Sequence, residues 1–195
     1  MLRLIGFYDY TVILTYLSLC SAIHGMLFAC KGKFTAAILC LFFCGVCDAF
    51  DGIVARTKKD RTEDGKSFGI QLDSLVDVIS FGLFPAALCY FMGVDGVIGV
   101  LIGVLYCICA VCRLAYFNVL ESNRQKTESG KNKAYRGLPV TSISLIFPLL
   151  YLVMKLLPGN IRVVLLHLML AIVAFLFVLD FRVKKPDLSK LIPMK

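Results

Sequence analysis

The chain of 195 residues is 59% hydrophobic and only 17% charged, which excludes a soluble domain with one buried helix and indicates a polytopic membrane protein. Its net charge of +8 is interpreted as lysines and arginines in cytoplasmic loops, where they contact anionic lipid head groups, rather than as a nucleic-acid binding surface. A membrane span needs about 20 apolar residues, so the length leaves room for about six spans and predicts one membrane domain over residues 1–195.

The apolar runs predict an all-α fold with six transmembrane helices. A short interfacial segment precedes the first of them. Pro85 and Pro148 fall within the third and fifth spans and predict kinks there. The spans are expected at about Val12–Ala29, Thr35–Ala55, Gly69–Met92, Val97–Leu120, Pro139–Leu157 and Arg162–Phe181. The charged stretches Arg56–Phe68 and Glu121–Arg136 are expected to be loops.

The distribution of basic residues predicts the orientation of the chain. Six spans place both termini on one side of the membrane, and 17 of the 21 lysines and arginines fall on that side. Since cytoplasmic loops carry the excess of Lys and Arg, both termini are expected to be cytoplasmic.

Small residues in the spans allow more than one interpretation. The nine cysteines lie in or near apolar runs and are interpreted as small hydrophobic residues, although two C-x-x-C spacings leave a zinc or redox site open. Gly99 and Gly103 form a G-x-x-x-G that a dimer interface would use, but glycine is common in membrane helices.

Four aspartates stand out, because a carboxylate inside a membrane span is costly and marks a candidate functional site. Asp48 and Asp51 are spaced i,i+3, and Asp73 and Asp77 are spaced i,i+4, so each pair falls on one face of a helix. Two such helices facing each other would bring the four carboxylates together. Such a cluster repels itself unless a cation lies in it, and oxygen ligands suit Mg²⁺, Mn²⁺ or Ca²⁺.

The wider pattern is D-x-x-D-G-x-x-A-R, then G-x-x-x-D-x-x-x-D. Four carboxylates can hold two divalent cations about 3.5–4 Å apart, an arrangement that clamps a phosphoryl centre. Asp77 is the candidate to accept a proton from an attacking hydroxyl. The remaining members would let a nucleotide approach closely, through small side chains, or bind its phosphate oxygens: Gly52, Ala55, Gly69 and Arg56.

Two alternatives do not involve catalysis. The aspartates could form structural ion pairs, but Arg56 alone lies near them in the sequence and cannot neutralise all four. They could instead form the relay of a metal-ion transporter, which predicts acidic residues distributed along a path. The four acids are expected at one depth.

The pattern closely resembles the signature of the CDP-alcohol phosphotransferase family, six-span membrane enzymes of phospholipid synthesis. Asp48, Asp51, Asp73 and Asp77 match its four aspartates, and all eight signature residues are present. One departure is the hairpin Thr57–Phe68, whose twelve residues exceed the family's usual eight or so.

Two further segments are similar to the phosphatidylserine synthase branch of that family. They are R-L-A-Y-F-N-V at Arg113–Val119 and Y-R-G-L-P-V at Tyr135–Val140. The resemblance implies that the hydroxyl of L-serine attacks the phosphorus of CDP-diacylglycerol, giving phosphatidylserine and CMP. It implies two Mg²⁺ or Mn²⁺ ions on Asp48, Asp51, Asp73 and Asp77, with Asp77 as the base, and a homodimer.

Serine brings a carboxylate toward four aspartates and therefore needs a counter-charge. Arg113 and Arg136 are the candidates, with Asn118 as a hydrogen-bonding partner, although both arginines could instead reach lipid phosphates. Glycerol phosphate or inositol phosphate remains an alternative acceptor. The expected location is the cell membrane, as a multi-pass protein whose active site faces the cytoplasm.

Overall fold

The computed structural model describes residues 6–7, 9–58, 60, 62–127 and 134–184. Helices account for most of this part of the chain, as predicted. Their bounds are η1 Tyr10–Val12, α1 Ile13–Cys30, α2 Phe34–Thr57, α3 Glu63–Asp77, η2 Val78–Leu83, α4 Phe84–Phe91, α5 Val97–Thr127, η3 Val140–Ser142, α6 Ile143–Met154 and α7 Gly159–Val178. Two short strands, β1 Ala134–Arg136 and β2 Arg182–Lys184, pair antiparallel.

The protein is an all-α multi-pass membrane protein. Within the described part of the chain, five helical segments are long and apolar enough to cross a bilayer: Tyr10–Cys30, Phe34–Ala55, Glu63–Phe91, Val97–Leu120 and Gly159–Val178. The sixth expected span corresponds to Val140–Met154, which is apolar but shorter. The count of six spans and the cytoplasmic position of both termini therefore stay predictions.

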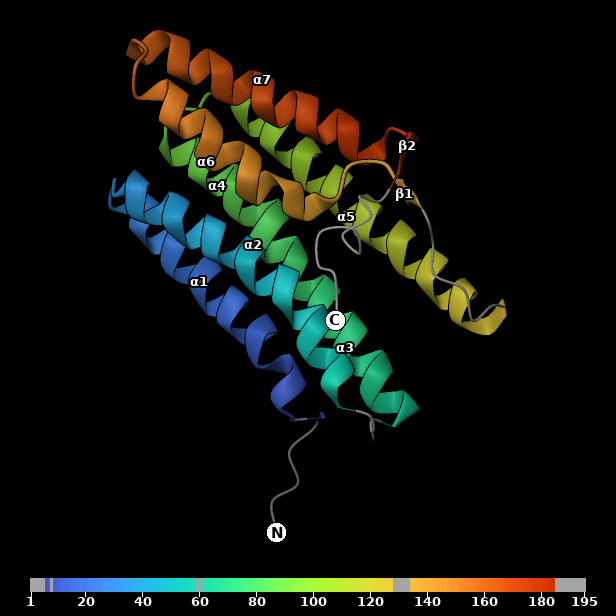
Figure 1. Ribbon diagram of the computed structural model, residues 1–195. Coiled ribbons are helices and arrows are strands. Elements are labelled where there is room, and N and C mark those ends of the chain that lie inside the picture. The colour runs from blue at the N-terminus through green and yellow to red at the C-terminus, as the bar shows by residue number, and fades with distance from the viewer. Residues whose placement is uncertain (1–5, 8, 59, 61, 128–133, 185–195) are drawn as a thin grey trace, which may run out of the picture.

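The helices pack as a bundle in which α1 lies along α2 and α5 lies along α7, with α6 against α2 (Figure 1). Glycines permit two of the close approaches. A Cβ at Gly25 of α1 would lie 2.2 Å from Cζ of Phe84, and one at Gly45 of α2 would lie 2.6 Å from Cβ of Ser144. Small residues at such crossings let membrane helices gain van der Waals contact without a clash.

The predicted loop Arg56–Phe68 is wrong over much of its length, because α2 continues to Thr57 and α3 begins at Glu63. The side chain of Thr62 caps α3 by accepting a hydrogen bond from the backbone N–H of Gly65 at 3.1 Å. Glu63 and Asp64 occupy the first turn, where carboxylates favour the helix dipole. Likewise α5 runs to Thr127, so the predicted loop Glu121–Arg136 begins as helix.

The helix that starts at Glu63 contains a π-helical segment, η2, between α3 and α4. Pro85 follows it and has no backbone N–H to donate to the carbonyl of Phe81, four residues earlier. The buried hydroxyl of Tyr106, on α5, donates to that carbonyl at 2.7 Å. Pro85 therefore coincides with a widened turn whose freed carbonyl is satisfied from a neighbouring helix.

The residues before α1 are anchored to the α2–α3 connection. Asp9 caps η1 by accepting hydrogen bonds from the backbone and hydroxyl of Thr11, and it forms an ion pair with Lys58 at 3.1 Å. These contacts, the hydroxyl of Thr11 first, lower the pKa of Asp9 to about 2, so it remains ionised at neutral pH. The ring of Phe7 packs against Phe68, with centroids 5.7 Å apart.

The G-x-x-x-G of α5 packs within its own chain. A Cβ at Gly99 would lie 2.6 Å from the carbonyl oxygen of Val94, and one at Gly103 would lie 3.9 Å from Cβ of Ala86. Their small size therefore accommodates the chain's own α4 and the turn after it. The predicted homodimer receives no support from these glycines.

Candidate active site

Three of the four predicted aspartates converge. Asp48 projects from α2, and Asp73 and Asp77 project from α3; one carboxylate oxygen of each lies within 4.8 Å of the others. Asp77 is buried, with 8% of its surface exposed, and the other two are half-buried. The i,i+4 spacing places Asp73 and Asp77 on one face of α3, and the antiparallel partner α2 supplies the third group.

Asp51 lies at the edge of this group. Its carboxyl group is within hydrogen-bonding reach of Asp73 and close enough to Asp48 to interact electrostatically. All four aspartates therefore belong to one cluster, with Asp48, Asp73 and Asp77 at its centre.

The cluster suits a divalent cation by its chemistry. Lys58 forms an ion pair with Asp9 and Lys66 forms one with Glu63, and neither pair involves the cluster. Half-buried carboxylates at such close range repel one another unless a positive charge lies between them. Several carboxylate oxygens on rigid helices form the donor set that Mg²⁺ and Mn²⁺ prefer.

The predicted nucleotide-binding residues lie on the same two helices, with Gly52 and Ala55 toward the C-terminal end of α2 and Gly69 in the middle of α3. A Cβ at Gly52 would meet no atom of the described residues within 4 Å, so among these residues nothing blocks an approaching molecule at this turn of α2. Ala55 and Gly69 are half-buried, on α2 and α3 respectively. The side chain of Arg56 lies outside the described part of the chain.

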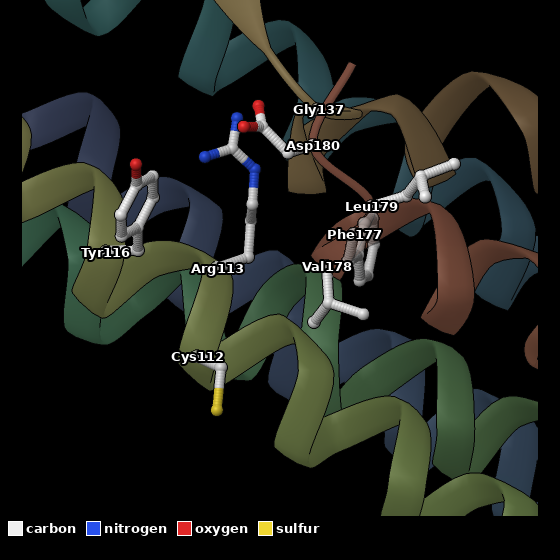
Figure 2. A pocket seen from close by; sticks show the side chains of 8 residues that line it. All are labelled: Cys112, Arg113, Tyr116, Gly137, Phe177, Val178, Leu179 and Asp180. Carbon is white, nitrogen blue, oxygen red and sulfur yellow. The ribbon is translucent and has the colours of Figure 1, made fainter.

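Arg113 lines a cavity of about 340 Å³ between α5 and the end of α7 (Figure 2). Only 8% of its surface is exposed, and its Nε donates to the carbonyl of Leu138 at 3.3 Å. The cavity lining consists of Cys112, Arg113, Tyr116, Gly137, Phe177, Val178, Leu179 and Asp180. The side chain of Arg136, the second predicted arginine, lies outside the described residues.

Two hydrogen bonds fix the depth of Arg113 relative to the aspartates. Ser74 Oγ donates to Asn118 Oδ1 at 2.9 Å, and the Tyr106 hydroxyl donates to the Phe81 carbonyl. Asp77 lies between the two contacts on one helix, and Arg113 lies between them on the other. Since the two helices run antiparallel, Arg113 is at about the depth of Asp77.

Sequence reasoning missed several of these residues. Ser74 lies between the two aspartates of α3 and holds Asn118, which was predicted only as an acceptor ligand. Asp180 follows the last span, and nothing in the sequence indicated that it would line the same cavity as Arg113, which lies 67 positions earlier. The hydroxyls of buried Ser18 and Ser80 lie 3.2 Å apart, and their contact was not predicted, although Ser18 lies on the face of the first span that was expected to point to the protein interior. The spacing of Ser80 three residues after Asp77 is a signal that could have identified it.

Three of the nine cysteines belong to the buried core, and the others are half-buried or exposed. Cys44, Cys47 and Cys89 are buried, and all nine thiols are free. Cys44 donates to the carbonyl of Ser18 at 3.3 Å. Among the described residues, the group with metal-binding geometry consists of aspartates rather than cysteines.

The chain is similar to known phospholipid-synthesis proteins. The model of the CDP-alcohol phosphatidyltransferase family matches residues 10–179. An archaetidylserine synthase of Methanothermobacter thermautotrophicus is 39% identical over 129 residues, covering 66% of this chain and 51% of the relative. A CDP-diacylglycerol–serine O-phosphatidyltransferase of Saccharomyces cerevisiae is 38% identical over 114 residues, covering 57% and 40%.

A protein with the same name from Bacillus subtilis is 32% identical over 121 residues, covering 61% of this chain and 60% of the relative. The chain spans about half the length of the curated relatives it matches. No solved structure matches it.

Proposed function

We propose, for a chain that belongs to the CDP-alcohol phosphatidyltransferase family, that it transfers the phosphatidyl group of CDP-diacylglycerol to the hydroxyl of L-serine. The observation that carries the proposal is the cluster of Asp48, Asp73 and Asp77 on two facing helices. The names of the relatives support serine as the acceptor. The family match favours a transferase over the metal-ion transporter.

The chain's own residues supply the parts of a direct displacement. The serine oxygen forms a bond to phosphorus, the bond to CMP breaks, and the hydroxyl proton passes to the carboxylate of Asp77. Asp48, Asp51 and Asp73, together with Asp77, would hold two Mg²⁺ or Mn²⁺ ions. Bound cations of this kind neutralise charge that develops on phosphoryl oxygens. The burial of Asp77 limits competition from water for its proton-accepting oxygen.

The donor would lie beside the C-terminal end of α2 and the middle of α3. Gly52, Ala55 and Gly69 have small side chains or none, and no atom of the described residues would lie within 4 Å of a Cβ at Gly52, so they leave room for the cytidine diphosphate beside the helix backbone. Arg56 is proposed to pair with its phosphates. On the acceptor side, Arg113 and Arg136 would provide counter-charge for the serine carboxylate, with Asn118 beside them.

Gly52→Ala tests the donor site with little interference from folding. Because no atom of the described part of the chain lies within 4 Å of the added methyl group, stability should hold or rise by roughly 0.5–1 kcal/mol. The KM for CDP-diacylglycerol should rise about tenfold or more, equivalent to ~1.4 kcal/mol of binding. Initial rates and thermal unfolding in detergent measure the two effects.

Gly25→Ala is the matched variant, since its methyl group would overlap Phe84. It should lower stability by about 1–3 kcal/mol while leaving the donor KM of the folded fraction unchanged. An unaltered donor KM in Gly52→Ala would remove the proposed close approach of the nucleotide.

We also infer a single domain over residues 1–195, a cell-membrane location, two cytoplasmic termini and an active site that faces the cytoplasm. Asp48 and Asp51 lie in the second half of the span Phe34–Ala55, and Asp73 and Asp77 lie no later than the middle of the span Glu63–Phe91. This position supports access from the side of the connection between the two spans, the side that carries most lysines and arginines. Homodimerisation remains part of the proposal on family grounds.

An acceptor competition assay tests the proposed function. Membranes that contain the protein, CDP-diacylglycerol and Mg²⁺ or Mn²⁺ should convert labelled serine to phosphatidylserine and release an equal amount of CMP. Glycerol phosphate and inositol phosphate, each supplied alone, should give at most trace product. Product from either phosphate, and none from serine, would reassign the chain to a sibling activity of the family.

A further inference from the structure

The cavity beside α5 holds two opposite charges. Figure 2 shows the guanidinium of Arg113 and the carboxylate of Asp180 pointing toward one another, and Asp180 is close enough to interact electrostatically with Arg113. Arg113 comes from the middle of the chain and is buried, whereas Asp180 follows the last helix and is exposed. One wall of the cavity is therefore cationic and its rim is anionic.

The backbone holds both groups in place. The N–H of Gly137 donates to the carbonyl of Phe181 at 2.7 Å, and the N–H of Leu138 donates to that of Leu176 at 3.3 Å. The carbonyl of Leu138 in turn accepts from Nε of Arg113. Gly137 has φ +70, and a Cβ there would lie 3.1 Å from the carbonyl oxygen of Leu179. Segment 137–138 thus ties the end of α7 to Arg113, so the charges are positioned before any ligand arrives.

We propose that this cavity is the site that recognises the amino-acid end of the acceptor, with Arg113 binding the carboxylate and Asp180 binding the ammonium of a zwitterion. The inference rests on the proposed function and deepens it. In a zwitterionic amino acid the ammonium and carboxylate groups are bonded to the same carbon, so they can face Asp180 and Arg113 respectively. Because the ligand has no net charge, the net charge of the site does not change when it binds. A guanidinium has five N–H donors and a carboxylate about four acceptor positions, so each can serve the ligand while facing the other.

Asp180 supplies the discrimination that Arg113 alone lacks. A guanidinium binds a phosphate as readily as a carboxylate, so it does not separate serine from glycerol phosphate or inositol phosphate. A carboxylate on the rim repels a phosphate that carries nearly two negative charges and attracts an ammonium. The pocket therefore selects an amino acid by attraction at one end and rejects a phosphorylated alcohol by repulsion at the other.

The location of the pocket agrees with the chemistry. Arg113 lies at about the depth of Asp77, because the Ser74–Asn118 and Tyr106–Phe81 contacts bracket both residues. A small amino acid held at this depth would be level with the proposed base.

The test is Asp180→Asn, compared with the wild type for three acceptors. They are L-serine, 3-hydroxypropionate, which lacks the ammonium group, and ethanolamine, which lacks the carboxylate. In Asp180→Asn the KM for serine should rise about 10- to 100-fold, the usual effect of losing a hydrogen bond to a charged group. The preference for serine over 3-hydroxypropionate should fall by a similar factor, with the KM for CDP-diacylglycerol unchanged.

Asp180→Glu should restore part of the serine preference, and Asp95→Asn, in the exposed turn before α5, serves as the control. If Asp180→Asn does not fold, the wild type carries the test, since it must prefer serine at least about tenfold over each truncated acceptor. Unchanged serine KM and unchanged selectivity in a folded Asp180→Asn protein would overturn the pocket while the proposed function stands. A wild type that makes no phosphatidylserine would overturn both.

Discussion

Asp77→Asn should reduce turnover by about 10²- to 10⁴-fold, the usual contribution of a general base. The carboxylate is buried among other carboxylates on α2 and α3, so an amide there occupies the same space but accepts no proton. Binding of CDP-diacylglycerol should persist, because the proposed nucleotide-binding residues are unchanged. Steady-state rates with saturating serine, together with donor binding, measure the two effects.

Thermal stability distinguishes a loss of turnover in Asp77→Asn from a failure of the variant to fold. In metal-free buffer Asp77→Asn should unfold at the same temperature as the wild type or higher, since one of several repelling charges is removed. Asp64→Asn is the control, because Asp64 lies exposed in the first turn of the same helix. Its turnover should stay close to that of the wild type. Full turnover in Asp77→Asn would exclude Asp77 as the base.

Chelation of divalent cations should abolish phosphatidyl transfer, and Mg²⁺ or Mn²⁺ should restore it. The same ions should stabilise the wild type against thermal unfolding, because binding relieves repulsion among Asp48, Asp73 and Asp77. At a metal concentration 100 times Kd, linkage predicts a gain of about 2.7 kcal/mol. Unfolding scans in detergent, with and without each ion, give this gain independently of activity.

The metal effect should depend on the cluster alone. Asp73→Asn should lose most of the stabilisation by Mg²⁺ and Mn²⁺, whereas Asp64→Asn should retain it. Equal stabilisation of both variants would mean that the ions act elsewhere on the protein. Transfer that continues in excess chelator would exclude the proposed cofactors.

Local spacing made much of the fold and the candidate site predictable. Apolar runs located the membrane helices, and the i,i+3 and i,i+4 spacings indicated which faces carried the aspartates. The structure brings Asp48, Asp73 and Asp77 together with Asp51 beside them. Helical periodicity is a local property, so it can be read from the residues themselves. The roles of these aspartates in metal binding and proton transfer stay predictions.

The features that escaped prediction depend on contacts between distant segments or on helix ends. The charges of Glu63 and Asp64 suggested a loop, but these residues form the first turn of α3, which Thr62 caps. Pairing of Ala134–Arg136 with Arg182–Lys184 joins two segments nearly 50 positions apart. The Arg113–Asp180 pair depends on how α5 and α7 pack, which neither segment specifies alone.

The π-helical segment η2 divides the third membrane helix into two halves with different phases. Each residue of an α-helix advances by about 100°, so one wider turn offsets all the side chains that follow it. Asp73 and Asp77 precede the offset, while Phe84 and Leu88, two of the most buried core residues, follow it. One half can therefore turn its acids toward α2 while the other independently fills the core. A helical wheel drawn over the whole helix would assign one of these faces incorrectly.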